Sequence, residues 1–395
     1  MDGDYQDQAT MIHLYVEHLI NIRTLSLQAS LATVSNKETK ATLSADGSLL
    51  TLTHEGQTAS ITLPVNLSPN RQSNVIFTIP AIPSRDLSFR IQLEEKELKP
   101  DSKGFLPNGQ SDDGNVIPWT ADTLTADTAI RCRMCDMPLL ERGKVQTWKD
   151  LPSEGWAEMM EFWHCHKPHE PHAHENGEGE KKGYAAGSQL ALEAGVGMVD
   201  PLDFLLLPVD CANVEVRASQ IDSLLECTQC NSTIGHVEST TGGYRLRKLN
   251  LSVSSREHKS SVSYDKQKWL ACLLLCAMDT KGVRKFIVHV GDKTMKLWLF
   301  TPDLTISSSA SESPEPTRVV KVLWQELDPS EQDIPERLTA ASLAEDELRV
   351  LDEEAQTLHK LLDDSAQLLP EGARKFQDWN VGLLQRFTAA DIKPL

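Results

Sequence analysis

Four of the eight cysteines form two pairs with the spacing of metal ligands. Cys132 and Cys135 enclose Arg-Met, and Cys227 and Cys230 enclose Thr-Gln, far along the chain. Each C-x-x-C turn directs two thiolates to one side, so two turns together complete a tetrahedral Cys₄ zinc site. Because such a site would fasten distant segments, the pattern predicts one structural zinc ion. Ordinary buried thiols are the alternative, and a redox role would need a βαβ context that the sequence lacks.

A fifth cysteine, Cys165, lies between His164 and His166. A neighbouring imidazole can take the thiol proton, and a nearby cation stabilises the thiolate, so this arrangement is typical of a nucleophile. Its expected position at the C-terminal turn of a helix opposes that role, because the helix dipole there disfavours an anion. A core cysteine or a spare zinc ligand is the alternative interpretation.

The segment that carries Cys165, residues 147–168, predicts an amphipathic helix. Pro152 and Ser153 are suited to its start, and Glu154 is placed where a carboxylate favours the N-terminal dipole. Pro168 ends it, since the residue before a proline avoids helical geometry. The apolar face consists of Trp156, Met159, Met160 and Trp163, for which core packing is the simpler interpretation.

The order of these features resembles a known signature: a C-x-x-C, then L-P-S-E-x-W at residues 151–156, then a Trp closely followed by a Cys. It is similar to that of the HECT-like, ubiquitin-conjugating-enzyme-binding family of D-type E3 ubiquitin-protein ligases. The similarity is specific over residues 130–168 and continues at residues 226–237, ECTQCNSTIGHV. It implies binding of a ubiquitin-charged conjugating enzyme (E2) and transfer of ubiquitin to a protein substrate, in cytosol and nucleus.

In the enzymatic form of this hypothesis, Cys165 takes ubiquitin as a thioester, with His164 or His166 as base or charge partner. The residues expected to support that site or to bind the partner are Pro152, Ser153, Glu154, Trp156 and Trp163. A HECT lobe carries its cysteine near the chain end, whereas the last cysteine here is Cys276 of 395 residues. The competing hypothesis is therefore a non-catalytic, zinc-stabilised adaptor or chaperone. Its partner would be a protein such as the endonuclease of messenger-RNA 3′-end cleavage, with which some family members are associated.

The composition restricts the class of protein. Hydrophobic residues make up 40% and charged residues 24%, which is ordinary globular usage. The net charge of −18 opposes a long contact with a nucleic-acid backbone, so no direct nucleic-acid partner is expected. The acidic N-terminus does not resemble a secretion signal, and the longest apolar run, Trp269 to Met278, is too short for a bilayer. We expect a soluble cytoplasmic or nuclear protein that does not associate with membranes.

The chain in order predicts an α+β fold. Short strand-like runs with Asp-Gly and Glu-Gly turns open it, and a C-terminal sheet with packed helices closes it. The expected parts are a β-sandwich-like N-terminal domain (1–98), a linker (99–128), a zinc-knuckle region with a His/Gly/Glu-rich insertion (129–241) and a C-terminal α+β region (242–395).

Two features are expected in the C-terminal region. Residues 265–280 read as an apolar helix, and alternating spacings of three and four between Ala341 and Leu362 predict a second, long helix. Residues 376–387 read as a short amphipathic tail that docks on the body.

Overall fold

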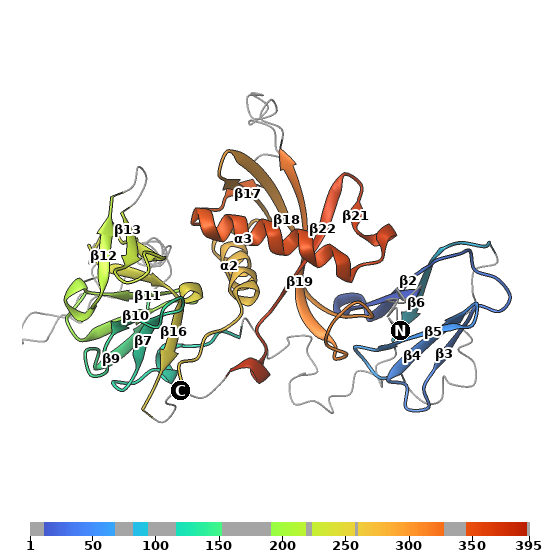
Figure 1. The fold of residues 1–395 in the computed structure, drawn as a ribbon, viewed down its shortest axis with the longest axis horizontal. Helices are drawn as coiled ribbons and strands as arrows, with labels where there is room; N and C mark the ends of the chain where they lie inside the picture. The colour runs from blue at the N-terminus through green and yellow to red at the C-terminus, as the bar shows by residue number, and fades with distance from the viewer. Residues whose placement is uncertain are drawn as a thin grey trace, which may run out of the picture. The chain divides into compact units, whose positions relative to one another are not determined.

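The computed structural model describes residues 12–67, 82–93, 116–151, 191–218, 223–256, 260–327 and 345–392. The chain divides into two compact units (Figure 1). Unit 1 comprises residues 1–116 and 273–389, and unit 2 comprises residues 117–272 and 390–395. Strands dominate the described residues, accompanied by two α-helices, which is consistent with the predicted α+β class.

The main sheet of unit 1 combines strands from both halves of the sequence. Its order is β21-β22-β19-β18-β1-β2-β6, and β17 pairs with both β18 and β20. The first strand, β1, lies between β2 and β18 and is antiparallel to both. The members are β1 (Ile12–Leu19), β2 (Thr24–Leu31), β6 (Asp86–Gln92), β17 (Lys285–Val290), β18 (Lys293–Ser308), β19 (Thr317–Leu327), β20 (Glu345–Glu347), β21 (Lys375–Phe376) and β22 (Trp379–Gln385).

A second, three-stranded sheet packs on part of the first. Its strands are β3 (Lys40–Leu43), β4 (Leu49–His54) and β5 (Gln57–Thr62). One apolar core draws on both sheets and includes Val16, Leu27, Leu52, Ile61 and Phe89. Along β6, exposed and buried residues alternate, as they do in a strand with one face on a core. This two-layer arrangement is sandwich-like, and each buried large side chain contributes roughly 1.5–3 kcal/mol relative to exposure.

The second α-helix, α3 (Asp352–Ser365), lies against β22 and β17 (Figure 1). The long helix predicted from Ala341 is confirmed over residues 352–362, but its predicted start is too early, because residues 345–347 form β20 and the helix begins at Asp352. Three acidic residues occupy its first turn, where the helix dipole favours carboxylates. Glu354 also accepts a hydrogen bond from the Leu351 N–H at 3.3 Å, which fixes the start. The predicted seam residues Leu358 and Leu362 are fully buried.

The tail predicted to dock on the body does so as strand β22, which pairs antiparallel with β19. Its four central residues, 381–384, are all buried. The sequence did not identify a strand here, because a short, continuous apolar run is compatible with either a buried strand or a helix. Gly382 permits close packing on α3, because a Cβ there would lie 2.7 Å from Leu362 Cδ2 and 3.0 Å from the Leu362 carbonyl oxygen.

Unit 2 contains two further sheets, of order β16-β7-β8 and β12-β13-β14-β15-β11-β10-β9. The smaller sheet consists of β7 (Ala129–Cys132), β8 (Pro138–Leu140) and β16 (Leu251–Ser254). The larger consists of β9 (Thr147–Asp150), β10 (Val196–Val199), β11 (Asp203–Leu206), β12 (Val214–Arg217), β13 (Leu224–Cys227), β14 (Thr233–Val237) and β15 (Tyr244–Arg247).

An aromatic cluster forms part of the core of unit 2. The Trp119 side chain is 2% exposed, and its ring lies 5.2 Å from that of Tyr264, 5.5 Å from Trp269 and 6.3 Å from Phe204. The sequence places Trp119 in the linker expected over residues 99–128. The packed unit thus begins before the expected boundary at residue 129.

Helix α2 (Lys266–Lys281) confirms the helix predicted at residues 265–280. The division between the units falls within it, after Cys272. Its residues 269–275 are all buried, so the apolar run belongs to protein cores. Among the helices that the structure describes, none combines the length and the apolar character that crossing a bilayer requires.

His18 gives unit 1 a titratable group in its core. The side chain is 6% exposed, and Nε2 has no hydrogen-bond partner in the described part of the chain. Burial lowers its pKa to about 4, against a smaller opposing effect of Asp303. Unfolded histidine titrates near pH 6.5, so the unfolded chain binds this proton more readily. Stability attributable to His18 is therefore complete above about pH 6.5 and is lost as the pH falls towards 4.

We expect His18→Phe to remove this acid-dependent loss, which amounts to about 3 kcal/mol at most. Urea unfolding of wild type and variant at pH 7 and pH 4.5 measures it, because other titrating groups are common to both. The control is His289→Phe, at a side chain that is 60% exposed in the same unit. Equal loss of stability in wild type and His18→Phe would contradict the expectation.

Candidate metal centre

The two C-x-x-C pairs occupy equivalent tight turns. Cys132 ends β7 and Cys227 ends β13, and each turn leads into an antiparallel strand. In both turns, the N–H of the residue after the second cysteine donates to the carbonyl of the first cysteine. Asp136 donates to Cys132 at 2.9 Å, and Asn231 donates to Cys227 at 2.8 Å. The same local structure therefore occurs twice.

Asp136 and Asn231 close these turns with left-handed backbone angles, φ 60° and 57°. Aspartate and asparagine adopt this region more readily than other residues with a side chain. Neither residue was predicted from the sequence. The position of an Asp or Asn directly after each second cysteine could have indicated the two turns.

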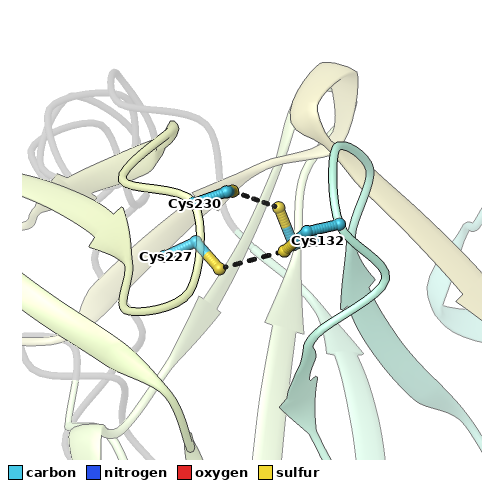
Figure 2. A group of neighbouring side chains, drawn as sticks. Cys132, Cys227 and Cys230 are labelled. Carbon is cyan, nitrogen blue, oxygen red and sulfur yellow. Dashed lines mark hydrogen bonds between the residues drawn. The ribbon is translucent and has the colours of Figure 1, made fainter.

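The turns bring four sulfur atoms together, all within 4.8 Å of one another. Cys132 Sγ lies 3.7 Å from Cys230 Sγ, and Cys135 Sγ lies 3.6 Å from Cys227 Sγ, with the two loops facing each other (Figure 2). In a tetrahedral site with metal–sulfur bonds of about 2.3 Å, neighbouring sulfurs are about 3.8 Å apart. The four cysteines are therefore close enough to hold one metal ion.

The described cysteines are free thiols, so the cluster contains no disulfide. Its two pairs belong to different sheets: Cys132 and Cys135 join β7 to β8 in the three-stranded sheet, and Cys227 and Cys230 join β13 to β14 in the seven-stranded sheet. An ion held by all four sulfurs would link the two sheets of unit 2.

The pKa values of the clustered thiols are shifted in opposite directions. The Ser232 hydroxyl lies 3.1 Å from Cys230 Sγ and 3.4 Å from Cys132 Sγ. Hydrogen bonding from Ser232 lowers the pKa of Cys230 to about 6, whereas burial raises the pKa of Cys135 to about 12 and also raises that of Cys227. Four thiolates at these distances repel one another, so a cation is needed for all of them to ionise together. A divalent, thiophilic metal meets that requirement.

The structure places the predicted metal ligands in one cluster, but the predicted catalytic and partner-binding residues lie outside the described residues. These are Pro152, Ser153, Glu154, Trp156, Trp163, His164, Cys165 and His166. Their roles remain predictions from the sequence.

The remaining described cysteines are less suited to nucleophilic chemistry. Burial, and then the neighbouring Asp210 carboxylate, raises the pKa of Cys211 to about 12. Cys272 is 2% exposed and Cys276 is partly buried, both on α2. A protein nucleophile needs an accessible thiolate, which these environments disfavour.

The chain belongs to the HECT-like ubiquitin-conjugating enzyme (E2)-binding family, whose sequence profile matches residues 17–381. The match spans both units, and it confirms the resemblance that the cysteine and tryptophan motifs indicate. Membership connects the protein with E2 enzymes.

Two fungal proteins are similar to the chain over much of its length. The uncharacterized protein C1734.10c of Schizosaccharomyces pombe is 26% identical over 297 residues, covering 69% of this chain and 78% of its own. The uncharacterized protein YJR141W of Saccharomyces cerevisiae is 24% identical over 382 residues, covering 94% of this chain and 98% of its own. No solved structure is significantly similar.

We expect purified protein to contain one bound metal ion per chain and Cys227→Ser to lose it. Stability should fall with the metal, because binding to a site formed only in the folded state contributes to folding. Elemental analysis and urea unfolding measure the two effects. Cys211→Ser is the matched control, since that thiol lies in the same unit outside the cluster. Metal-free wild-type protein with undiminished stability would contradict the assignment.

Proposed function

We propose that this protein binds a ubiquitin-charged E2 and promotes transfer of ubiquitin to lysines of a protein substrate. The observation that carries the proposal is the match to an E2-binding family across residues 17–381, which includes the four-cysteine cluster. In this proposal the cluster holds a zinc ion that stabilises the fold of unit 2 and takes no part in the chemistry.

Zinc is the metal that best fits the cluster. Four cysteine thiolates at tetrahedral spacing form a closed set, which is typical of structural zinc, whereas catalytic zinc sites keep one position open for water or substrate. The sulfur-to-sulfur distances of 3.6 and 3.7 Å support such a set. Elemental analysis distinguishes zinc from iron, the main alternative for four thiolates.

Unit 2 is the proposed site of E2 binding. The stretch with the family signature, residues 151–168, lies in the sequence between β9 and β10, which are parallel neighbours in the seven-stranded sheet. Both flanking strands thus belong to the sheet whose β13–β14 hairpin carries Cys227 and Cys230. A zinc ion that fixes this sheet would also fix the supports of the signature stretch.

Cys165 is the proposed nucleophile. Its thiolate attacks the carbonyl carbon of the thioester between E2 and ubiquitin, the E2 thiolate leaves, and a new thioester forms. A substrate lysine amine then displaces Cys165 and loses its proton to form an isopeptide bond. Exchange between thioesters is close to balanced in energy, so the protein would mainly contribute proximity and orientation.

The second candidate function is that of a non-catalytic adaptor or chaperone for a partner protein, such as the endonuclease of messenger-RNA 3′-end cleavage. One observation favours it: every described cysteine lies in the metal cluster or is partly or fully buried elsewhere. On this alternative, unit 2 is a zinc-stabilised binding surface and ubiquitin is never bound covalently.

The proposed location is the cytosol and the nucleus. Cysteine sulfurs 3.6 Å apart that are not joined by a disulfide are compatible with a reducing compartment. The net charge of −18 also supports partners with basic surfaces over nucleic acids.

A single-turnover reaction with a panel of ubiquitin-charged E2 enzymes tests the function. Wild-type protein should form a ubiquitin adduct that is seen on non-reducing gels and lost on thiol treatment, and Cys165→Ser should form none. Cys211→Ser is the control for cysteine replacement in the same unit, and Cys227→Ser reports dependence on the metal.

The outcomes separate the two functions. E2 binding without an adduct in wild type would contradict covalent transfer and favour the adaptor. No measurable binding of any charged E2 would contradict the proposed function as a whole.

A further inference from the structure

A polar pocket of about 510 Å³ opens on unit 2 beside the three-stranded sheet. Three arginines line it, Arg131, Arg142 and Arg256, together with three serines. Its volume lies in the range of small-molecule sites. Such sites are usually mostly apolar, yet no aromatic or aliphatic side chain is among the described residues that line this one. Its chemistry is that of an anion site.

Arg142 is the fixed cation of this pocket. Its Nε donates to the carbonyl of Asp127 at 3.1 Å, and Nη2 donates to the carbonyl of Ser255 at 2.9 Å and faces Ser254 Oγ at 3.4 Å. Within the described ranges these partners are neutral, so they orient the guanidinium and leave its charge uncompensated. A guanidinium held in this way is prepared to bind an oxyanion.

Arg131 and Asp136 form the wall nearest the metal centre, immediately before Cys132 and after Cys135 in sequence. Arg131 Nη1 donates to the Asp136 carbonyl at 2.8 Å and to its carboxylate at 3.2 Å. Ser261 Oγ donates to the other carboxylate oxygen at 3.3 Å. These contacts compensate the negative charge of Asp136, and they use Nη1 of Arg131 while Nε and Nη2 have no partner in the described part of the chain.

Arg256 completes the group from the exposed side. Its side chain is 79% exposed and lies 3.4 Å from the Asp127 carboxylate, at a distance that leaves it able to turn towards a ligand. Ser260, an exposed residue on the same wall, adds a hydroxyl donor. The three guanidinium groups outnumber the two carboxylates beside them, Asp136 and Asp127, so the pocket carries a net positive charge in a chain whose net charge is −18.

We propose that this pocket binds the phosphate group of a phosphoserine or phosphothreonine in a protein partner. A phosphate monoester presents three acceptor oxygens and nearly two negative charges, which match the guanidinium forks and the serine hydroxyls. Clusters of arginines are the usual means of recognising phosphorylated motifs. The space exceeds that of a phosphate alone and admits the side chain that carries it.

A nucleic-acid ligand fits less well. Single-stranded nucleic acids stack their bases on aromatic rings, and the described lining of the pocket contains none. A longer phosphate backbone would also experience the repulsion of the strongly acidic chain. One confined group of arginines is suited to a single phosphate on a protein.

Calorimetric titration of the full-length protein tests the proposal. The probes are N-acetyl-phosphoserine amide, its unphosphorylated counterpart, inorganic phosphate and adenosine 5′-monophosphate. The phosphoserine probe should bind wild type and should bind Arg142→Gln at least about tenfold more weakly, as expected for loss of a charge-assisted contact. Arg256→Gln, at an exposed side chain that the fold does not need, should weaken binding as well. Arg217→Gln is the matched control, a 70% exposed arginine on β12 outside the pocket.

Several results would overturn the proposal: no binding of the phosphoserine probe, equal binding of the unphosphorylated probe, or unchanged affinity in both Arg142→Gln and Arg256→Gln. Tighter binding of adenosine 5′-monophosphate than of phosphoserine would reject a protein ligand. Metal content is measured for each variant. The result is independent of the charged-E2 reaction, since the pocket can bind phosphoserine whether or not the protein transfers ubiquitin.

Discussion

The convergence of four cysteine sulfurs is the constraint on which unit 2 depends. One pair projects from each of its two sheets, and the most distant members, Cys132 and Cys230, are 98 positions apart in the chain. A cross-link that closes a loop of about 100 residues removes unfolded-state entropy worth about 4–5 kcal/mol in the simplest chain model. That amount is comparable to the whole stability of many domains. Small sheets with strands of three to five residues gain much from such a link, because each sheet buries little surface of its own.

A second connection between the two sheets of unit 2 is a buried lysine. Lys248 lies in the short helical turn between β15 and β16, one strand from each sheet, and is fully buried. Its ammonium group donates to the carbonyls of Asp200 at 2.7 Å and Trp119 at 3.0 Å and lies 5.1 Å from the centre of the Phe204 ring. A buried charge is tolerated only when its hydrogen bonds are satisfied, and carbonyl dipoles supply them here. Lys248 therefore connects the aromatic cluster and the seven-stranded sheet to the segment that leads to β16.

Local sequence patterns correctly predicted the structural features that depend on residues close together in the sequence. The C-x-x-C spacing led to the cluster, the apolar run of α2 led to a helix, and Glu55-Gly56, with φ values of 48° and 79°, forms the predicted two-residue turn between β4 and β5. In the pairing of β1 with β18, Tyr15 lies opposite Ser308, far along the chain, and such long-range pairing leaves no local pattern in either segment. The same limit explains β22, which lies between the edge strand β21 and β19: its residues 381–384 are all buried, so its pattern lacks the alternation of a half-exposed strand.

The cysteine cluster and the arginine pocket are mechanically connected through one residue. Asp136 closes the first knuckle in a left-handed conformation, and its carboxylate orients Arg131 towards the pocket. A metal ion that fixes the knuckle therefore also fixes one arginine of the pocket. Four thiolates around a divalent ion would carry a net negative charge and repel a phosphate, and Arg131, next to Cys132 in sequence, would place a positive charge between the two sites. Any free energy by which the metal favours phosphate binding must equally favour metal binding when phosphate is present. With a metal bound, this turn would both link the two sheets and support the proposed phosphate site, so loss of the metal would affect the two properties together.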